Sequence, residues 1–308
     1  MNFEGVEKVA AAVLYEGYIL YPYRPTAIKN RQRWNFGTLY PRVYAQAQRP
    51  QEPFRMVAEC LAVIDGEATL DVRLRFLQLI RQRGGMTELT DPSLAWDEAV
   101  ERTVEQSNLA INDLLTSPLW LRVPLDQLQI ELTIAARMLD ERACKLRFEV
   151  ENATPLASGA QAKREEALPL SFVSAHLLLG IHGAKFISLL DPPEEYRAAV
   201  AGCSNEGVFP VLAGEEPDRG ILFCSPIILY DYPKIAPESD GDFFDGTEMD
   251  EMLTLRVLTM TDAEKQEMLK VDPRARRILE RTEALTGEAM LKTHGVIRDL
   301  REIRGDES

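Results

Sequence analysis

The sequence predicts an α+β protein, and three features lead to that prediction. Residues 68–80 alternate apolar side chains with polar or charged ones, which is the period of a strand with one buried face. Residues 126–139 and 144–152 repeat this alternation and are joined by the short segment "LDERA". Helix-capping patterns dominate from residue 247 onward. We therefore expect an antiparallel sheet or sandwich-like domain, followed by a mixed α/β half that ends in three or four helices.

The N-terminal part of the chain supplies a helix and the first strands. Apolar residues fall at helical spacing over residues 4–15, which predicts a short helix. The segment "FRMVAECLAVI", residues 54–64, has the composition of a strand. Asp65-Gly66 separates it from residues 68–80 and is a typical turn dipeptide. The pattern predicts a β-hairpin.

The pattern of the second half predicts strands followed by helices. Four apolar runs predict strands, and "DPPEEYRAAVAGC" between them predicts a short helix; the runs are residues 170–181, 184–190, 207–214 and 220–230. Thr261 with Glu264, and Pro273 after Asp272, mark two further helix starts.

A candidate domain boundary lies at residues 152–167. This stretch, "NATPLASGAQAKREEA", is small, polar and without periodicity. It divides the chain into residues 1–165 and residues 166–308.

Composition narrows the class of protein. The 308-residue chain carries a formal charge of -14 and a pI near 4.9, which disfavours nucleic acid as a partner because phosphate binding needs a broad positive face. No run approaches the ~20 apolar residues that span a bilayer, so no membrane insertion is expected. The four cysteines form no C-x-x-C pair and predict buried free thiols in a cytoplasmic protein. No cofactor is predicted, and no pattern indicates an oligomeric state.

Positive charge and aromatic rings gather near the N-terminus. No acidic residue occurs between Glu16 and Glu52, whereas six basic and seven aromatic residues do. The rings can pack over the core while the cations stay in water, or the segment can dock a partner, since Arg, Tyr and Trp are enriched at binding hot spots. The candidate partner-binding residues are Tyr21, Tyr23, Arg24, Lys29, Asn30, Arg31, Arg33 and Trp34.

The most acidic segment is "SDGDFFDGTEMDE", residues 239–251. It suggests a cation site with the candidate ligands Asp240, Asp242, Asp245, Glu248 and Glu251. As a twelve-residue calcium loop from Asp240, it places Phe244 at the fifth position and glycine at the seventh instead of the sixth. A helix entry with acids near its N-terminus explains the same residues without a metal.

The remaining reactive side chains have structural explanations. His176 and His182 fall on one face of a predicted strand, without a third ligand nearby, and His294 borders a helical apolar stripe. Cys203 lies between glycines in a turn, and no pattern assigns a base to it. Walker, G-x-G-x-x-G, G-x-S-x-G and H-E-x-x-H motifs are absent from the sequence.

Long stretches of the chain resemble a family of bacterial proteins encoded among nickel–iron hydrogenase genes. The resemblance begins at "LYEGYILYPYRPTAIKNRQRWNFGTLYPRVY" and continues through "FISLLDPPEEYRAAV" and "CSNEGVFPVL". It also includes "CSPIILYDYPKIAPESDGDFFDGTEMDEMLTLRVLTMTDAEK" and "DPRARRILERTEAL". The resemblance implies a cytoplasmic role beside hydrogenase, in its maturation, assembly or regulation.

The cysteine and motif content limits that role. A hydrogenase large subunit and a zinc-bearing nickel chaperone need C-x-x-C pairs, an iron–sulfur subunit needs clustered cysteines, and a nickel-loading GTPase needs a P-loop. We therefore expect a non-enzymatic accessory protein that binds a protein partner, such as a hydrogenase subunit or maturation factor. The alternatives are an enzyme with an unrecognised Asp, Glu, Arg and Tyr site, or a metal-binding protein that uses residues 240–251.

The basic segment yields a first testable prediction. Arg31→Ala combined with Arg33→Ala should barely change the melting temperature, because exposed ion pairs contribute only ~0–1 kcal/mol. The same double variant should lose its partner, since hot-spot arginines are worth ~2 kcal/mol or more each. Trp34→Ala should damage folding more, by ~3–5 kcal/mol if the ring is buried. Thermal denaturation that unfolds the arginine variant but spares the tryptophan variant would refute the docking interpretation.

Overall fold

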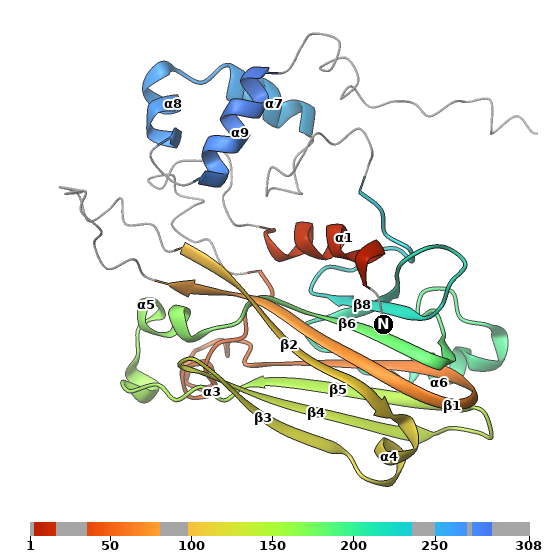
Figure 1. The fold of residues 1–308 in the computed structure, drawn as a ribbon. Helices are drawn as coiled ribbons and strands as arrows, with labels where there is room; N and C mark the ends of the chain where they lie inside the picture. The colour runs from red at the N-terminus through yellow and green to blue at the C-terminus, as the bar shows by residue number, and fades with distance from the viewer. Residues whose placement is uncertain (1–2, 17–35, 81–97, 236–249, 270–272, 285–308) are drawn as a thin grey trace, which may run out of the picture. The chain divides into compact units, whose positions relative to one another are not determined.

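The computed structural model describes residues 3–16, 36–80, 98–235, 250–269 and 273–284 (Figure 1). They fall into two compact units, one with the described residues up to Lys234 and one with those from Ile235. The strands are β1 Arg55–Ile80, β2 Glu98–Ala110, β3 Leu119–Leu125, β4 Leu128–Met138, β5 Ala143–Asn152, β6 Val173–Phe186, β7 Phe209–Leu212 and β8 Ile221–Ser225. The helices of the first unit are α1 Glu4–Leu14, α3 Arg42–Ala47, α4 Ile111–Thr116, α5 Arg164–Ala167 and α6 Arg197–Ala201. Three short 3-10 turns are η2 Gly159–Gln161, η3 Leu168–Leu170 and η4 Glu194–Tyr196.

The first unit is built on one antiparallel sheet, which confirms the predicted α+β class. The strand order is β3-β4-β5-β1-β6-β8-β7, and β2 pairs with β1 outside this path. Residues 62–63 of β1 pair with both β5 and β6, and residues 69–77 lie between β2 and β6. One edge of β1 therefore pairs first with β5 and then with β2, while β6 follows the other edge (Figure 1).

The predicted hairpin at Asp65-Gly66 is wrong. β1 continues through this dipeptide, because β6 pairs with it on both sides of the turn signal. The register shifts between Ile64 and Thr69, so the intervening residues form a bulge in place of a reversal. Gly183 of β6 has φ +69° and lies so close to the bulge that a Cβ would stand 2.0 Å from the Glu67 carbonyl oxygen.

The alternation seen in the sequence produces the main core. Even-numbered residues of β1, β4 and β5 and the odd-numbered residues of β6 up to Ile181 point to one face, where Phe76, Phe148, Leu177 and Ile130 are fully buried. Beyond Gly183, Ala184 and Phe186 of β6 lie on this face. Ile111 and Leu114 of α4 join this cluster. Full burial of such side chains stabilises the fold by ~1.5–3 kcal/mol each.

Helix α1 covers the opposite face of β6, β7 and β8. A second apolar cluster forms there. Its members from α1 and the residue before it are Phe3, Val6, Ala10 and Val13, and those from the strands include Leu178, Val211 and Phe223. The Ser174 hydroxyl donates a hydrogen bond of 2.7 Å to the Val13 carbonyl and fixes the end of the helix. The expected helix at residues 4–15 is confirmed by α1.

The predicted boundary at residue 165 does not separate units in the described structure. β6 lies after this boundary, yet it pairs with β1 in the same sheet. The predicted linker also begins with a buried side chain: Asn152 Nδ2 donates to the carbonyls of Leu39 and Leu170, each at 2.9 Å. The polar composition suggested an exposed linker, but the Asn152 amide is buried because it donates hydrogen bonds to buried backbone carbonyls. The two strands predicted at residues 170–181 and 184–190 are, over residues 173–186, the single strand β6.

The second unit contains three helices among its described residues: α7 Asp250–Leu258, α8 Asp262–Leu269 and α9 Pro273–Ala284. Glu264 Oε2 accepts from the Thr261 backbone at 2.9 Å, as the capping pattern predicts, and Pro273 begins α9. Lys265 pairs with Glu283 at 2.8 Å and joins α8 to α9. None of the helices in the described ranges is long and apolar enough to cross a membrane.

The bulge gives a stability prediction. Gly183→Ala forces a Cβ into the Glu67 carbonyl, whereas Gly66→Ala, at φ +137°, meets no atom within 4 Å. Both changes strain the backbone, so the clash should make Gly183→Ala less stable than Gly66→Ala by an additional ~1–3 kcal/mol. Urea denaturation measures the difference. Equal stabilities would show that β1 and β6 separate freely at this point.

Candidate functional site

The residues proposed from sequence lie mainly outside the described structure. This holds for all eight partner-binding candidates, from Tyr21 to Trp34, and for the acidic candidates Asp240, Asp242, Asp245 and Glu248. Glu251 belongs to the backbone of α7, and its side chain is not described. Within the described ranges, no group of three or more His, Cys, Asp or Glu residues is placed to hold a metal ion.

The described end of the basic, aromatic segment is part of the fold. Tyr40 and Tyr44 are buried, with ring centroids 5.3 Å apart. Arg42 forms ion pairs with Glu151 and, at 3.3 Å, with Glu131. Over residues 36–49, internal packing and pairing therefore explain these side chains.

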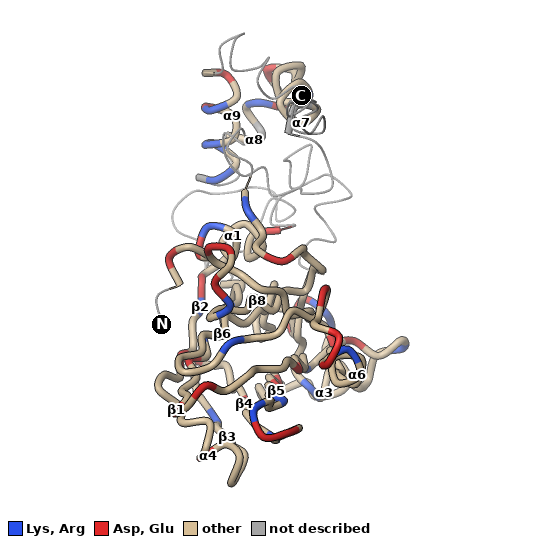
Figure 2. Tube along the Cα trace, turned by 90° about the vertical axis from the view of Figure 1, so that its right-hand side faces the viewer, with Lys and Arg blue, Asp and Glu red and all other residues tan. Residues whose placement is uncertain are grey.

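The outward face of β1 and β2 carries an ionic row beside α1. Arg73 pairs with Glu7 of α1 at 3.0 Å and with Glu105 of β2 at 2.6 Å, and its guanidinium lies 4.8 Å from the centroid of the Phe3 ring. Two residues along β1, Arg75 donates to Glu101 at 3.2 Å. Figure 2 shows acidic and basic residues interspersed along the strands.

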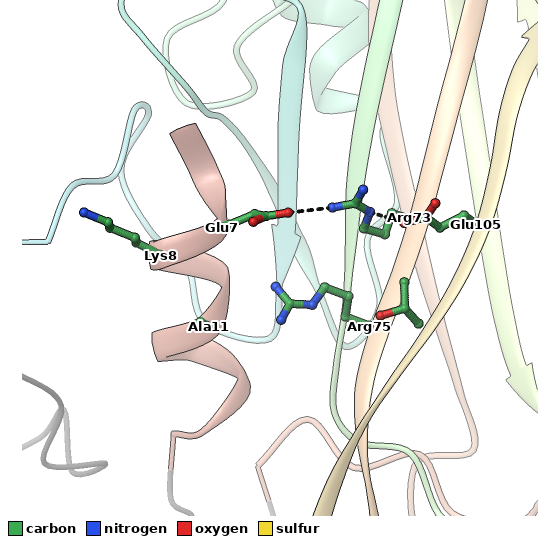
Figure 3. Close-up of a pocket in the computed structure, with 7 residues that line it drawn as sticks. Glu7, Lys8, Ala11, Arg73, Arg75 and Glu105 are labelled. Carbon is green, nitrogen blue, oxygen red and sulfur yellow. Dashed lines mark hydrogen bonds and ion pairs between the residues drawn. The ribbon is translucent and has the colours of Figure 1, made fainter. Parts of the chain in front are cut away.

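An open hollow lies over this row. It has a volume of about 550 Å³ and is bordered by α1 on one side and by β1 and β2 on the other (Figure 3). The lining residues are Glu7, Lys8, Ala11, Arg73, Arg75, Thr103 and Glu105. The hollow lies within the first unit and combines cations with hydroxyl and carboxylate groups.

Glu59 anchors the loop that contains Cys203. Its carboxylate accepts from Lys145 at 2.6 Å, Arg147 at 3.1 Å and the Ser204 N–H at 2.8 Å. Burial alone would raise the Glu59 pKa, but these hydrogen bonds hold that pKa below its usual value. The Glu59 carboxylate is therefore fully hydrogen-bonded within the protein, and we interpret its role as structural: it holds the Cys203 loop against β1.

The cysteine thiols are poorly suited to nucleophilic or metal chemistry. Burial raises the pKa of the Cys144 thiol to about 11 and raises the pKa values of the Cys60, Cys203 and Cys224 thiols. At Cys203, burial outweighs the opposite effect of Lys145 on the thiol pKa. A thiolate is the reactive and metal-binding form, so neutral pH disfavours both roles at these positions.

His176 is a buried neutral side chain. It is fully buried on β6, its Nδ1 lies 2.9 Å from the Ser174 carbonyl oxygen, and its ring meets Phe223 edge-on at 5.3 Å. Burial, with a smaller effect from Arg75, lowers the His176 pKa to about 3. His182 shares its strand face as predicted, but six residues of strand span roughly 20 Å, too far for both rings to bind one ion.

A second surface is apolar. Ile228 and Tyr230 are 70% and 61% exposed, and Leu229 between them packs against the cluster beneath α1. Asp231 accepts from the Ser188 hydroxyl at 2.5 Å and from the Leu212 N–H at 2.8 Å. The Ser188 oxygen in turn accepts from the N–H of Leu190, whose side chain is 45% exposed. We call Leu190, Ile228 and Tyr230 the exposed apolar surface.

The sequence contained weak signals for both sites. Arg73 and Arg75 were visible as polar positions of an alternating strand, but their neighbours on α1 and β2 were not. The run "PIILY" resembles a buried strand, so its exposed side chains were missed. Comparisons with models of protein families and with curated proteins gave no match.

His176 predicts a specific pH dependence. Its pKa is about 3 in the fold and 6.5 ordinarily, so the unfolded chain binds the extra proton. The stability that the fold gains from keeping His176 neutral is therefore complete above about pH 6.5 and is lost as the pH falls toward 3. In His176→Gln, the free energy of unfolding should depend less on pH between 6.5 and 4.5, by about 1.4 kcal/mol per pH unit.

Chemical denaturation at a series of pH values measures that slope. His182→Gln is the matched control, because His182 is 53% exposed on the same strand face and should retain most of the slope. Identical slopes in the wild type and His176→Gln would contradict a neutral buried imidazole.

Proposed function

We propose that this protein is a cytoplasmic, non-enzymatic accessory protein for nickel–iron hydrogenase maturation, assembly or regulation, and that it acts by binding another protein. The link to hydrogenase is supported by the sequence resemblance described above. Buried thiols with raised pKa values favour a binding role over thiolate-mediated metal transfer. The observation that carries the binding role is the exposed apolar surface.

The exposed apolar surface is held in a fixed shape. Asp231 links the 188–191 turn to the segment that presents Ile228 and Tyr230, and Leu229 attaches that segment to the core. The Tyr230 hydroxyl also bonds the backbone of Lys234 at 3.2 and 3.3 Å. Docking onto such a surface costs little conformational entropy, which favours a protein partner.

The charges around this surface favour a basic partner segment. The adjoining turn carries the exposed acids Asp191, Glu194 and Glu195, and the 214–219 loop carries Glu215, Glu216 and Asp218. Exposed Arg197, which pairs with Glu194 at 3.0 Å, and exposed Arg219 offset two of these six negative charges. Burial raises the pKa of Tyr232, while nearby Arg219 lowers that pKa and Asp231 and Glu216 raise it, so the loop borders the Asp231 region. We infer that the occupant is a basic, partly apolar segment of a partner protein, since complementary charge speeds and orients docking.

Affinity capture from cells that express a complete nickel–iron hydrogenase gene cluster tests the proposal. Ile228→Asp combined with Leu190→Asp should fold normally and lose more than tenfold in affinity for the captured hydrogenase subunit or maturation factor. Val43→Asp is the matched control, because Val43 is 47% exposed on α3 and should retain binding.

Two results would overturn the proposal. Capture of no hydrogenase protein by the wild type would remove the functional link. Equal capture by the double variant and Val43→Asp would show that the exposed apolar surface is not the docking site.

A further inference from the structure

We propose that the hollow between α1 and the β1–β2 pair binds a small anionic metabolite through a carboxylate or phosphate group, with Arg75 as the principal ligand. This inference is independent of the docking proposal. It assigns a small-molecule site to the first unit, where the docking proposal assigns a protein surface.

The two arginines of the hollow are bound differently. Arg73 is enclosed by Glu7, Glu105 and the Phe3 ring, and the two carboxylates offset its charge. Arg75 uses Nη2 to bond Glu101, and within the described residues its Nε and Nη1 have no partner. The Glu101 carboxylate accepts from Arg75 through Oε2 and from the Tyr15 hydroxyl, at 2.8 Å, through Oε1.

The free side of Arg75 faces the hollow. Figure 3 shows its guanidinium directed toward α1 at the level of Ala11, whose small side chain leaves the space open. The Arg75 side chain is only 12% exposed, so its charge is partly shielded from water. An anion there would meet a stronger field than at the open surface.

A hydroxyl donor stands beside the guanidinium. Thr103 is the cross-strand partner of Arg75, lines the hollow and is exposed. In the described structure its hydroxyl has no hydrogen-bond partner. Directly opposed residues on antiparallel strands lie ~5 Å apart, so one ligand oxyanion can reach both groups.

Arg75 supplies the attraction for an anion. Glu7 and Glu105 offset the charge of Arg73, and Figure 3 shows the Lys8 side chain directed away from Arg75, whose one carboxylate partner among the described residues is Glu101. The free Nε–H and Nη1–H donors lie on different edges of the guanidinium, and each can give a charge-assisted hydrogen bond to an oxygen of a carboxylate or phosphate. The hollow's volume of about 550 Å³ falls in the range of ligand sites of ~300–1,000 Å³.

Calorimetric titration of the full chain with sodium phosphate and, separately, sodium succinate tests the site at constant ionic strength. We expect saturable binding of at least one anion, and the stronger binder identifies the phosphate or the carboxylate class. Arg75→Gln should weaken it about tenfold or more, because a charged hydrogen bond is lost. Arg142→Gln removes an exposed arginine that pairs with Asp65 and should leave binding unchanged.

A second variant keeps the test decisive if Arg75→Gln does not fold. Ala11→Glu places a carboxylate on α1 facing Arg75, so it should occupy the site and abolish anion binding while raising the melting temperature. Ala11→Gln is its uncharged control and should retain anion-dependent stabilisation. Absence of saturable binding of both anions, or equal binding by Arg75→Gln and Arg142→Gln, would overturn the proposal.

Discussion

The pairing of β1 along both of its edges is the constraint on which the rest of the first unit depends. This 26-residue strand contacts β5, β2 and β6, so segments far apart in the chain are held in one sheet. The bulge after Ile64 lets one edge pass from β5 to β2 without ending the strand. Gly183 permits the close backbone approach that keeps β6 paired on both sides of this irregularity.

Burial on both sides of the sheet then decides which polar residues remain available. One face of β1 forms the main core, and its opposite face carries Glu59, Arg73 and Arg75. Glu59 is satisfied by two cations and a backbone N–H, and Arg73 by two carboxylates. Arg75 bonds a single carboxylate, that of Glu101, through Nη2, so within the described residues its Nε and Nη1 remain as donors. Differences in partner number, not in residue type, distinguish structural charges from a candidate binding group.

The two proposed sites use different physical chemistry. The exposed apolar surface has fixed backbone geometry and acidic surroundings, which suit a basic and partly apolar protein segment. The hollow beside α1 has a shielded guanidinium and an adjacent hydroxyl, which suit a small oxyanion. α1 contributes to both regions, because its apolar face packs near Leu229 while Glu7 and Ala11 border the hollow.

The sequence by itself determined the α+β class, the α1 helix, the capped start of α8 and the alternation of β1, β4 and β5, because these follow from local periodicity and capping. It also predicted free thiols from their spacing. It failed at Asp65-Gly66 and at Asn152, where local turn and linker chemistry is overridden by pairing with β6 and by buried backbone carbonyls. Only the tertiary structure decided that Arg75 faces α1 and that Ile228 is exposed. Both depend on partners distant in the chain, and no local pattern encodes which partner fills the space beside a side chain.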